Sequence, residues 1–137
     1  MINNFNSFYL AAPWEIKEKA ATLATKIEKE GFICARRWWL SEGHNDEELR
    51  ENAEADFQGV READFFILLN SQPRGQETSG KAVETGAALL ISRIGYMKLA
   101  GLGTRGTNIF QLLDDFNWFD SEEALIEWMK QERSLSE

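Results

Sequence analysis

The chain contains few of the residues that build disulfide scaffolds or metal centres. Its 137 residues include one cysteine, Cys34, and one histidine, His44. A single cysteine excludes an intrachain disulfide. A lone histidine near Asp46 and Glu47, without helical or hairpin spacing, is a weak basis for a metal site. We therefore expect Cys34 to be an inert thiol in an apolar strand, His44 to be a loop residue, and no metal site.

Long apolar runs and an excess of positive charge are also missing. No run approaches the ~20 apolar residues of a membrane-spanning helix. Residues 1–6 lack the basic start and the long apolar stretch of a signal peptide. The net charge of −8 disfavours a nucleic-acid polymer as partner, because such binding neutralises phosphates with Lys and Arg. These absences predict a soluble cytoplasmic protein without a membrane partner, and they leave a single nucleoside or nucleotide open as a ligand.

What the chain does contain is an alternation of strand-like apolar runs and segments with helical periodicity. We expect strands at residues 7–12, 32–38, 64–70, 94–100 and 117–119, and helices at residues 14–30, 46–62, 79–92, 108–113 and 121–131. The run at 64–70 is apolar without alternation, as in a parallel strand covered on both faces. The pattern predicts one α/β domain over residues 1–137, with a mostly parallel sheet of about five strands.

The strand at 64–70, the polar loop after it and the helix that follows form the most informative stretch. Ligands of open α/β sheets collect at the carboxyl ends of the strands. The free backbone N–H groups at Ser79 and Gly80, in the first helical turn, favour a polar ligand. Glu84 lies about one turn further on, at a boundary position of an otherwise apolar helix. It is a candidate nucleophile or base, and the alternative is a solvated glutamate paired with Lys81.

Other polar residues have an ordinary structural explanation beside a functional one. From the residues alone, Asp64 is better explained as a cap or turn residue, and Tyr9 as a core tyrosine with a satisfied hydroxyl. Arg74 is either a solvated loop arginine or a contact for an anionic substrate. The run 36–39, Arg-Arg-Trp-Trp, fits strand packing with an exposed edge better than nucleic-acid stacking. Motifs of nucleotide hydrolases, serine hydrolases and dinucleotide enzymes are missing.

Four segments, in this order, resemble the nucleoside 2-deoxyribosyltransferase family and its nucleotide N-glycosidase relatives. They are Tyr9–Pro13, Asp56–Asp64, Ser79–Ala88 and Asn108–Phe110. The first is similar to the family's Tyr-Leu-Ala-Gly-Pro, and the third to its Ser-Gly-x-x-x-Glu-apolar-Gly-x-Ala helix. The resemblance implies a flavodoxin-like three-layer sandwich, a cleft for a 2-deoxynucleoside, no metal or organic cofactor, and a homodimer or higher homo-oligomer.

The same resemblance implies roles for individual residues. Glu84 would attack the anomeric carbon and form a glycosyl-enzyme, from which a second base takes the sugar with net retention. Asp64 would contact the leaving base and assist its protonation, and Tyr9 would hold the Glu84 carboxylate by a hydrogen bond. Ser79 would bind the 5′ side of the sugar, and Asn108, which in the family often reaches the site of a neighbouring subunit, would complete that pocket.

Several positions depart from the family pattern. Ala12 replaces a glycine, Thr78 stands where many members have aspartate, and residues 13–15 offer no phosphate cradle. The last departure favours a nucleoside over a nucleotide unless Arg74 supplies a charge. Two alternatives stay open: an N-glycosidase in which water takes the sugar, and a non-catalytic nucleoside- or nucleotide-binding module.

Overall fold

The computed structural model describes residues 5–70, 79–106 and 108–136, and it contains one sheet of five parallel strands. The strands are β1 (Ser7–Ala11), β2 (Ile33–Cys34), β3 (Phe65–Asn70), β4 (Lys98–Gly103) and β5 (Phe116–Phe119). They lie side by side in the order β2-β1-β3-β4-β5, and each neighbouring pair is parallel. This is the strand order of the flavodoxin-like fold.

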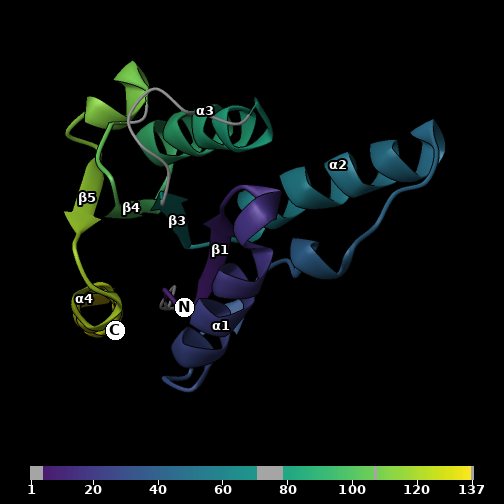
Figure 1. The fold of residues 1–137 in the computed structure, drawn as a ribbon. Coiled ribbons are helices and arrows are strands. Elements are labelled where there is room, and N and C mark those ends of the chain that lie inside the picture. Colours follow the sequence, from purple (N-terminus) through teal and green to yellow (C-terminus); the bar gives the residue numbers. More distant parts are fainter. Residues whose placement is uncertain (1–4, 71–78, 107, 137) are drawn as a thin grey trace.

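Helices cover both faces of the sheet. They are α1 (Lys17–Glu28), α2 (Asp46–Glu62), α3 (Ser79–Ile94) and α4 (Glu122–Ser136), with short 3-10 helices η1 (Trp14–Ile16), η2 (Trp38–Leu40) and η3 (Ile109–Leu112). Helices α2 and α3 lie on one face, and α1 and α4 on the other (Figure 1). The predicted three-layer α/β fold is therefore confirmed. Within the described ranges, no helix has the length and apolar character needed to cross a membrane.

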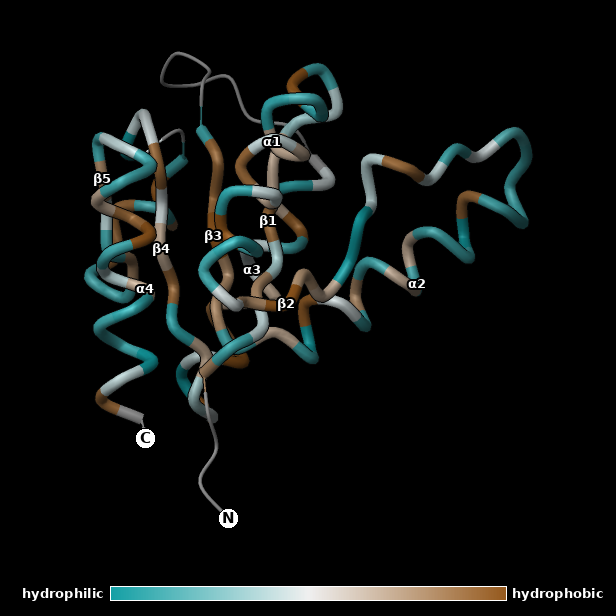
Figure 2. Tube along the Cα trace, turned by 90° about the horizontal axis from the view of Figure 1, so that it is seen from below, coloured by the Kyte–Doolittle hydropathy of each residue, from teal (hydrophilic) through white to brown (hydrophobic). Residues whose placement is uncertain are grey.

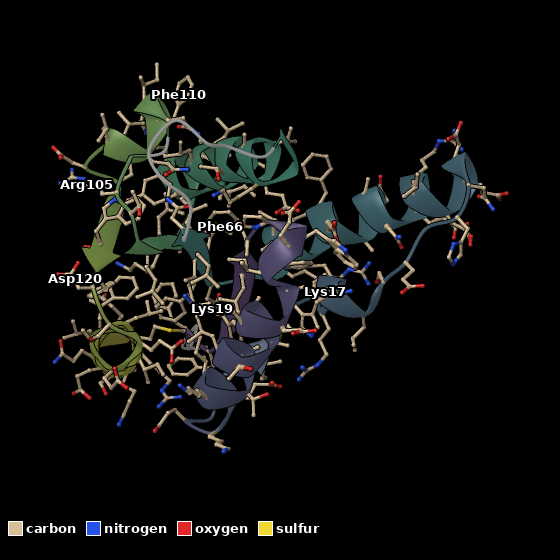
Figure 3. The ribbon with its side chains drawn as sticks, in the orientation of Figure 1. Lys17, Lys19, Phe66, Arg105, Phe110 and Asp120 are labelled. Carbon is tan, nitrogen blue, oxygen red and sulfur yellow. The ribbon has the colours of Figure 1, made fainter. Side chains whose placement is uncertain are left out.

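The core lies along β1 and β3, which are the apolar centre of the molecule in Figure 2. All six residues of β3 are buried, because helices cover the sheet on both sides. Tyr9 of β1 pairs in register with Phe66 of β3, and their rings stack with centroids 6.0 Å apart. Phe66 is labelled inside the sheet in Figure 3. A tyrosine therefore stands within a row of apolar residues, at the middle of a central strand.

Local signals place most helix ends. Asn45 caps α2, because its side-chain oxygen accepts from the Glu48 backbone N–H at 2.9 Å. Ser121 caps α4 in the same way, through the Ala124 N–H at 3.1 Å. Gly31 follows α1 with a φ of 93°, the left-handed conformation that suits glycine. These ends lie within a few residues of the predicted ones, except that α4 continues beyond residue 131.

The second strand is much shorter than predicted. Only Ile33–Cys34 pair with β1, whereas the apolar pattern predicts a strand over 32–38. The aromatic end of that run forms η2 instead, and Trp38 donates its indole N–H to the Leu10 carbonyl at 2.6 Å. The prediction was too long because Trp38 is buried over the end of β1, and a buried aromatic residue extends the apolar run in the sequence in the same way as a further strand residue would.

The fourth strand begins later than predicted. Helix α3 continues to Ile94, and β4 covers Lys98–Gly103 rather than residues 94–100. Gly101 is therefore a strand residue and not part of a turn. A Cβ at this position would lie 2.4 Å from the Trp118 ring, so the glycine allows β5 to pack its tryptophan against β4.

Candidate functional site

A cavity of about 280 Å³ lies at the carboxyl end of the sheet, beside β1 and β3. The chain leaves β1 toward one edge of the sheet and β3 toward the other, so this is the switch point at which such folds bind ligands. The cavity is lined by Ala12, Pro13, Trp14, Glu15, Trp38, Asp56, Gly80, Lys81 and Glu84. A smaller cavity of about 210 Å³ shares Asp56, Gly80 and Glu84, and adds Ala53, Phe57 and Val83.

Glu84 is held by the tyrosine of the central strand. The Tyr9 hydroxyl donates to Glu84 Oε2 at 2.8 Å, and the Tyr9 side chain is fully buried. Among the residues that the structure describes, none donates a hydrogen bond to Oε1. One carboxylate oxygen of Glu84 is thus fixed from the core, while the other is left for a ligand in the cavity.

Burial changes the acid–base properties of this pair. It raises the pKa of Glu84 to about 7, with a smaller rise from the Asp56 charge, while the Tyr9 hydrogen bond lowers it. Burial and the Glu84 charge also raise the pKa of Tyr9 far above its ordinary value. Tyr9 therefore stays a neutral hydrogen-bond donor, and Glu84 can gain or lose a proton near neutral pH.

Asp56 supplies a second carboxylate to the same cavity. It lies in α2, and its Oδ1 accepts from Arg36 Nε at 3.1 Å. Burial raises the pKa of Asp56, and the Arg36 charge and hydrogen bond oppose that rise. Within the described part of the chain, no residue donates to Oδ2. Each carboxylate is therefore anchored through one oxygen by a partner from another element.

Sequence reasoning did not single out Asp56 as a functional residue. Its position in the helix could have indicated a function. Asp56 lies on the same side of α2 as Ala53, Phe57 and Val60, which is the side that packs against the rest of the protein. A carboxylate on such a stripe needs a partner or a function, and here it has Arg36 as partner and faces a cavity.

Asp64 lies elsewhere. Its Oδ2 accepts hydrogen bonds from the backbone N–H groups of Asn6 and Ser7, at 3.0 and 3.1 Å, and from the Ser7 hydroxyl. Asp64 precedes β3, so it stands at the amino edge of the sheet, whereas the cavity lies at the carboxyl edge. This corrects the expectation that Asp64 meets the leaving base. It is a turn residue that ties the start of β1 to the start of β3.

Of the remaining predicted site residues whose side chains or backbone the structure describes, one lines the cavity and one does not. Gly80 lines the cavity with Glu84. Asn108 does not: its Oδ1 caps η3 by accepting from the Phe110 N–H at 2.9 Å, and it borders a separate cavity of about 360 Å³. Ser79 begins α3, but its side chain and the whole of Arg74 lie outside the described residues.

Lys81 does not form a surface pair with Glu84. Its side chain is 2% exposed, and its ammonium donates to Asn70 Oδ1 at 2.7 Å. Asn70 in turn donates to Gln111 Oε1 at 2.7 Å, so a buried polar network closes the carboxyl end of β3. The solvated alternative for Glu84 is therefore not what the structure shows.

Two tryptophans form an aromatic wall on the other side of the cavity. Trp38 is fixed by its hydrogen bond to the Leu10 carbonyl, and its ring centroid lies 6.2 Å from that of Trp14. Trp14 is 45% exposed, and the Lys17 ammonium lies 4.1 Å from its ring centroid. Lys17 is labelled at the start of α1 in Figure 3. The run 36–39 thus contributes to the site as well as to packing.

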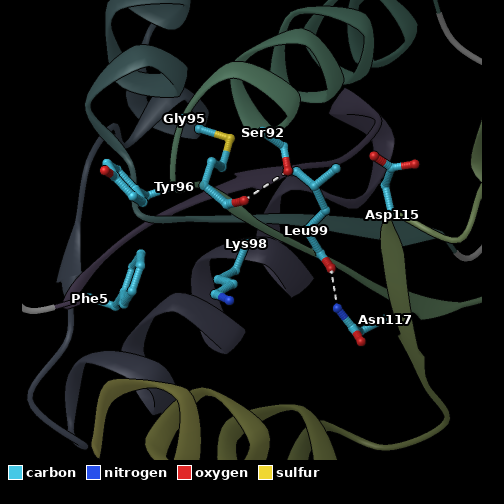
Figure 4. Close-up of a pocket in the computed structure, with 9 residues that line it drawn as sticks. Phe5, Ser92, Gly95, Tyr96, Lys98, Leu99, Asp115 and Asn117 are labelled. Atoms are coloured by element: carbon cyan, nitrogen blue, oxygen red, sulfur yellow. Dashed lines mark hydrogen bonds between the residues drawn. The ribbon is translucent and has the colours of Figure 1, made fainter. Parts of the chain in front are cut away.

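Other polar clusters have structural explanations. A cavity of about 340 Å³ lies at the opposite, amino edge of β4, between Phe5 and Tyr96 on one side and Asp115 and Asn117 on the other (Figure 4). In it Asn117 donates to the Leu99 carbonyl at 3.1 Å. Over the residues that the structure describes, no three His, Cys, Asp or Glu side chains form a group that could hold a metal ion.

The fold is similar to that of a solved enzyme. A 2-deoxyribosyltransferase from the psychrotolerant bacterium Bacillus psychrosaccharolyticus superposes with a TM-score of 0.64 and 17% sequence identity, over 88% of this chain and 90% of that one. That enzyme is described as a biocatalyst for the synthesis of antiviral and antitumoral nucleosides. No protein-family model and no curated protein sequence matches the chain. The similarity establishes a shared fold, which agrees with the resemblance of the four sequence segments.

Proposed function

We propose that the protein cleaves the N-glycosidic bond of 2-deoxynucleosides through a covalent intermediate on Glu84 and passes the sugar to another base. The hydrogen bond of 2.8 Å from Tyr9 to Glu84 carries this proposal, because it orients a buried carboxylate at the ligand-binding edge of the sheet. The shared fold with a 2-deoxyribosyltransferase supports it.

In the first half of the reaction, Glu84 Oε1 attacks the anomeric carbon while Tyr9 holds Oε2. The electron pair of the C–N bond moves to the base as the new C–O bond forms. Asp56 Oδ2 gives its proton to the departing base nitrogen, which makes a neutral base the leaving group. In the second half, an incoming base attacks the same carbon, Asp56 takes the proton back, and the configuration is retained.

The two carboxylates suit these different roles. A nucleophile must be ionised, and the Tyr9 hydrogen bond favours the ionised form of Glu84. Burial raises the pKa of Asp56 as well as that of Glu84, and the reactive form is the one in which the proton is on Asp56 and Glu84 is ionised. Trp14 and Trp38 provide flat apolar surfaces against which a base stacks beside the reacting bond.

Hydrolysis is a second candidate, favoured by the openness of the smaller cavity. Phe57 and Val83, which line it beside Glu84, are 46% and 57% exposed, so water reaches the intermediate from this side. Leu90, two turns after Val83 in α3, is also exposed, and so is Phe110 of η3. We propose that a second copy of the chain covers this face, and a monomer in light scattering would contradict that.

Chromatography of reaction mixtures tests the proposed function. The protein is incubated with each deoxynucleoside or its 5′-monophosphate, with and without a different free base. We expect a new nucleoside only when the second base is present, and a mass increase of one deoxyribosyl group on the Glu84 peptide when it is omitted. Free base without an acceptor would establish hydrolysis. If neither product forms across the panel, the proposal is wrong, and binding of the same nucleosides is the next property to measure.

A further inference from the structure

We infer that Arg36 is a positioning residue for this reaction, which acts by holding Asp56 so that its free oxygen reaches the leaving base. The inference rests on the proposed function. It extends the site to a residue that the sequence pattern places in strand packing and that touches neither the sugar nor the base.

Arg36 stands on a fixed backbone. It follows β2, where the Ala35 N–H donates to the Phe8 carbonyl at 2.8 Å and the Cys34 thiol donates to the Arg36 carbonyl at 3.5 Å. The side chains of Arg36 and Asp56 are 23% and 27% exposed, so the pair is largely withdrawn from water. A partly buried, charge-assisted hydrogen bond is stronger and more directional than one on the surface.

A glycine in α2 makes the close approach of these groups possible. A Cβ on Gly59 would lie 2.6 Å from Arg36 Cβ and 3.1 Å from the Tyr9 ring. Helix α2 thus packs against both residues at once, in the turn that follows Asp56. The anchor of Asp56 and the anchor of Glu84 are parts of one packed cluster, built from β1, α2, α3 and the segment after β2.

This arrangement has a chemical consequence. Asp56 Oδ1 is engaged by Arg36, so only Oδ2 is available to carry a proton to the base. When the proton leaves, Asp56 becomes an anion in a cavity that also holds the acidic residues Glu15 and Glu84, and the Lys81 ammonium that lines the same cavity donates to Asn70. The Arg36 cation stabilises that anion as it forms. Arg36 therefore fixes the direction of the proton and lowers the cost of its transfer.

The experiment compares two leaving groups. The first substrate is a purine deoxynucleoside, whose base must be protonated to leave. The second is the same nucleoside methylated at N7, whose base leaves without a proton. For Arg36→Met we expect kcat on the first substrate to fall about tenfold or more, while kcat on the second stays within about threefold of wild type. Arg36→Lys should recover part of the loss.

Three controls separate the outcomes. Asp56→Asn should show the same selective loss in stronger form, and Glu84→Gln should lose both substrates. Arg37→Met is the matched control, because Arg37 pairs with Glu28 on the surface, and it should change neither rate. Equal losses on both substrates in Arg36→Met would overturn the inference and leave Arg36 a structural residue.

The variants also guard against misfolding and against failure of the underlying proposal. If Arg36→Met does not fold, Arg36→Lys and Arg36→Gln give the same comparison of leaving groups, and an equal loss in them overturns the inference. If the wild-type protein turns over neither substrate, the proposed function itself fails. This outcome differs from failure of the inference about Arg36, because it is seen in the protein that still has Arg36.

Discussion

Replacing Glu84 by glutamine tests the electrostatic account of the site as well as its chemistry. Burial raises the pKa of Glu84 from an ordinary 4.5 to about 7 in the folded protein. That difference corresponds to about 3 kcal/mol between the protonated and ionised forms. Glutamine has nearly the same shape and never ionises, so the variant avoids the cost of a buried charge.

The sign of the effect follows from proton binding. Between the two pKa values the folded wild-type protein holds a proton on Glu84 that the unfolded chain has released. The stability from this group is therefore full below pH 4.5 and is lost as the pH rises to about 7. Below about pH 4.5 we expect the difference in unfolding free energy between wild type and Glu84→Gln to be independent of pH. Above neutrality, the variant should gain up to about 3 kcal/mol relative to wild type.

Urea unfolding of both proteins, at several pH values between about 4.5 and 8 and at one protein concentration, measures this difference. All other titrating groups are shared, so their contributions largely cancel in the comparison. A stability difference that stays constant across the series would refute the reasoning, because it would mean that Glu84 has an ordinary pKa. The same variant should show no glycosyl transfer at any pH.

Three further substitutions test single contacts of the cavity. Tyr9→Phe removes the hydrogen bond that lowers the pKa of Glu84, so the acidic limb of the kcat/KM profile should move to higher pH; an unmoved limb would exclude this role. Gly59→Ala places a Cβ 2.6 Å from Arg36 Cβ and should cost about 1–3 kcal/mol in urea unfolding; an unchanged midpoint would contradict the packing. Trp14→Ala should raise KM about tenfold with little change in kcat, since base stacking contributes about 1–3 kcal/mol; an unchanged KM would place the base elsewhere.

The elements that the sequence predicts well are those set by local chemistry. Helix α2 begins and ends at the predicted residues, because Asn45 caps it and because its apolar positions recur at helical spacing. The predicted fourth strand ends at residue 100, before Gly101, because glycine is more typical of turns than of strands. A glycine is needed at this position because the Trp118 ring packs against it. The two residues are 17 positions apart in the chain, so no local sequence pattern shows this contact.

The same contrast holds within the site. Glu84 and Tyr9 lie in segments with a recognisable pattern, and the hydrogen bond between them was expected before the structure. Trp38, which lines the cavity, and Arg36, which holds Asp56 beside it, were not expected at the site, because both also pack against the fold: Trp38 on β1, Arg36 under α2. A side chain that does both has the sequence signature of packing alone, and only the arrangement of the elements distinguishes the two.

The choice between Asp64 and Asp56 could have been made from geometry. Both occur in one segment that resembles the family, at opposite ends of it. Helix α2 returns to the amino edge of the sheet before β3 starts, so residues earlier in the helix lie nearer the carboxyl edge. Asp56 lies six residues before the end of α2 at Glu62, which at 1.5 Å per residue is about 9 Å along the helix, and Ala63 adds an extended residue before Asp64. The aspartate that precedes the strand is therefore confined to the amino edge, while the one about two turns earlier stands beside Glu84. In this fold the helix that precedes β3 carries a carboxylate to the ligand edge about two turns before the strand begins, and the residue next to the strand cannot reach that edge.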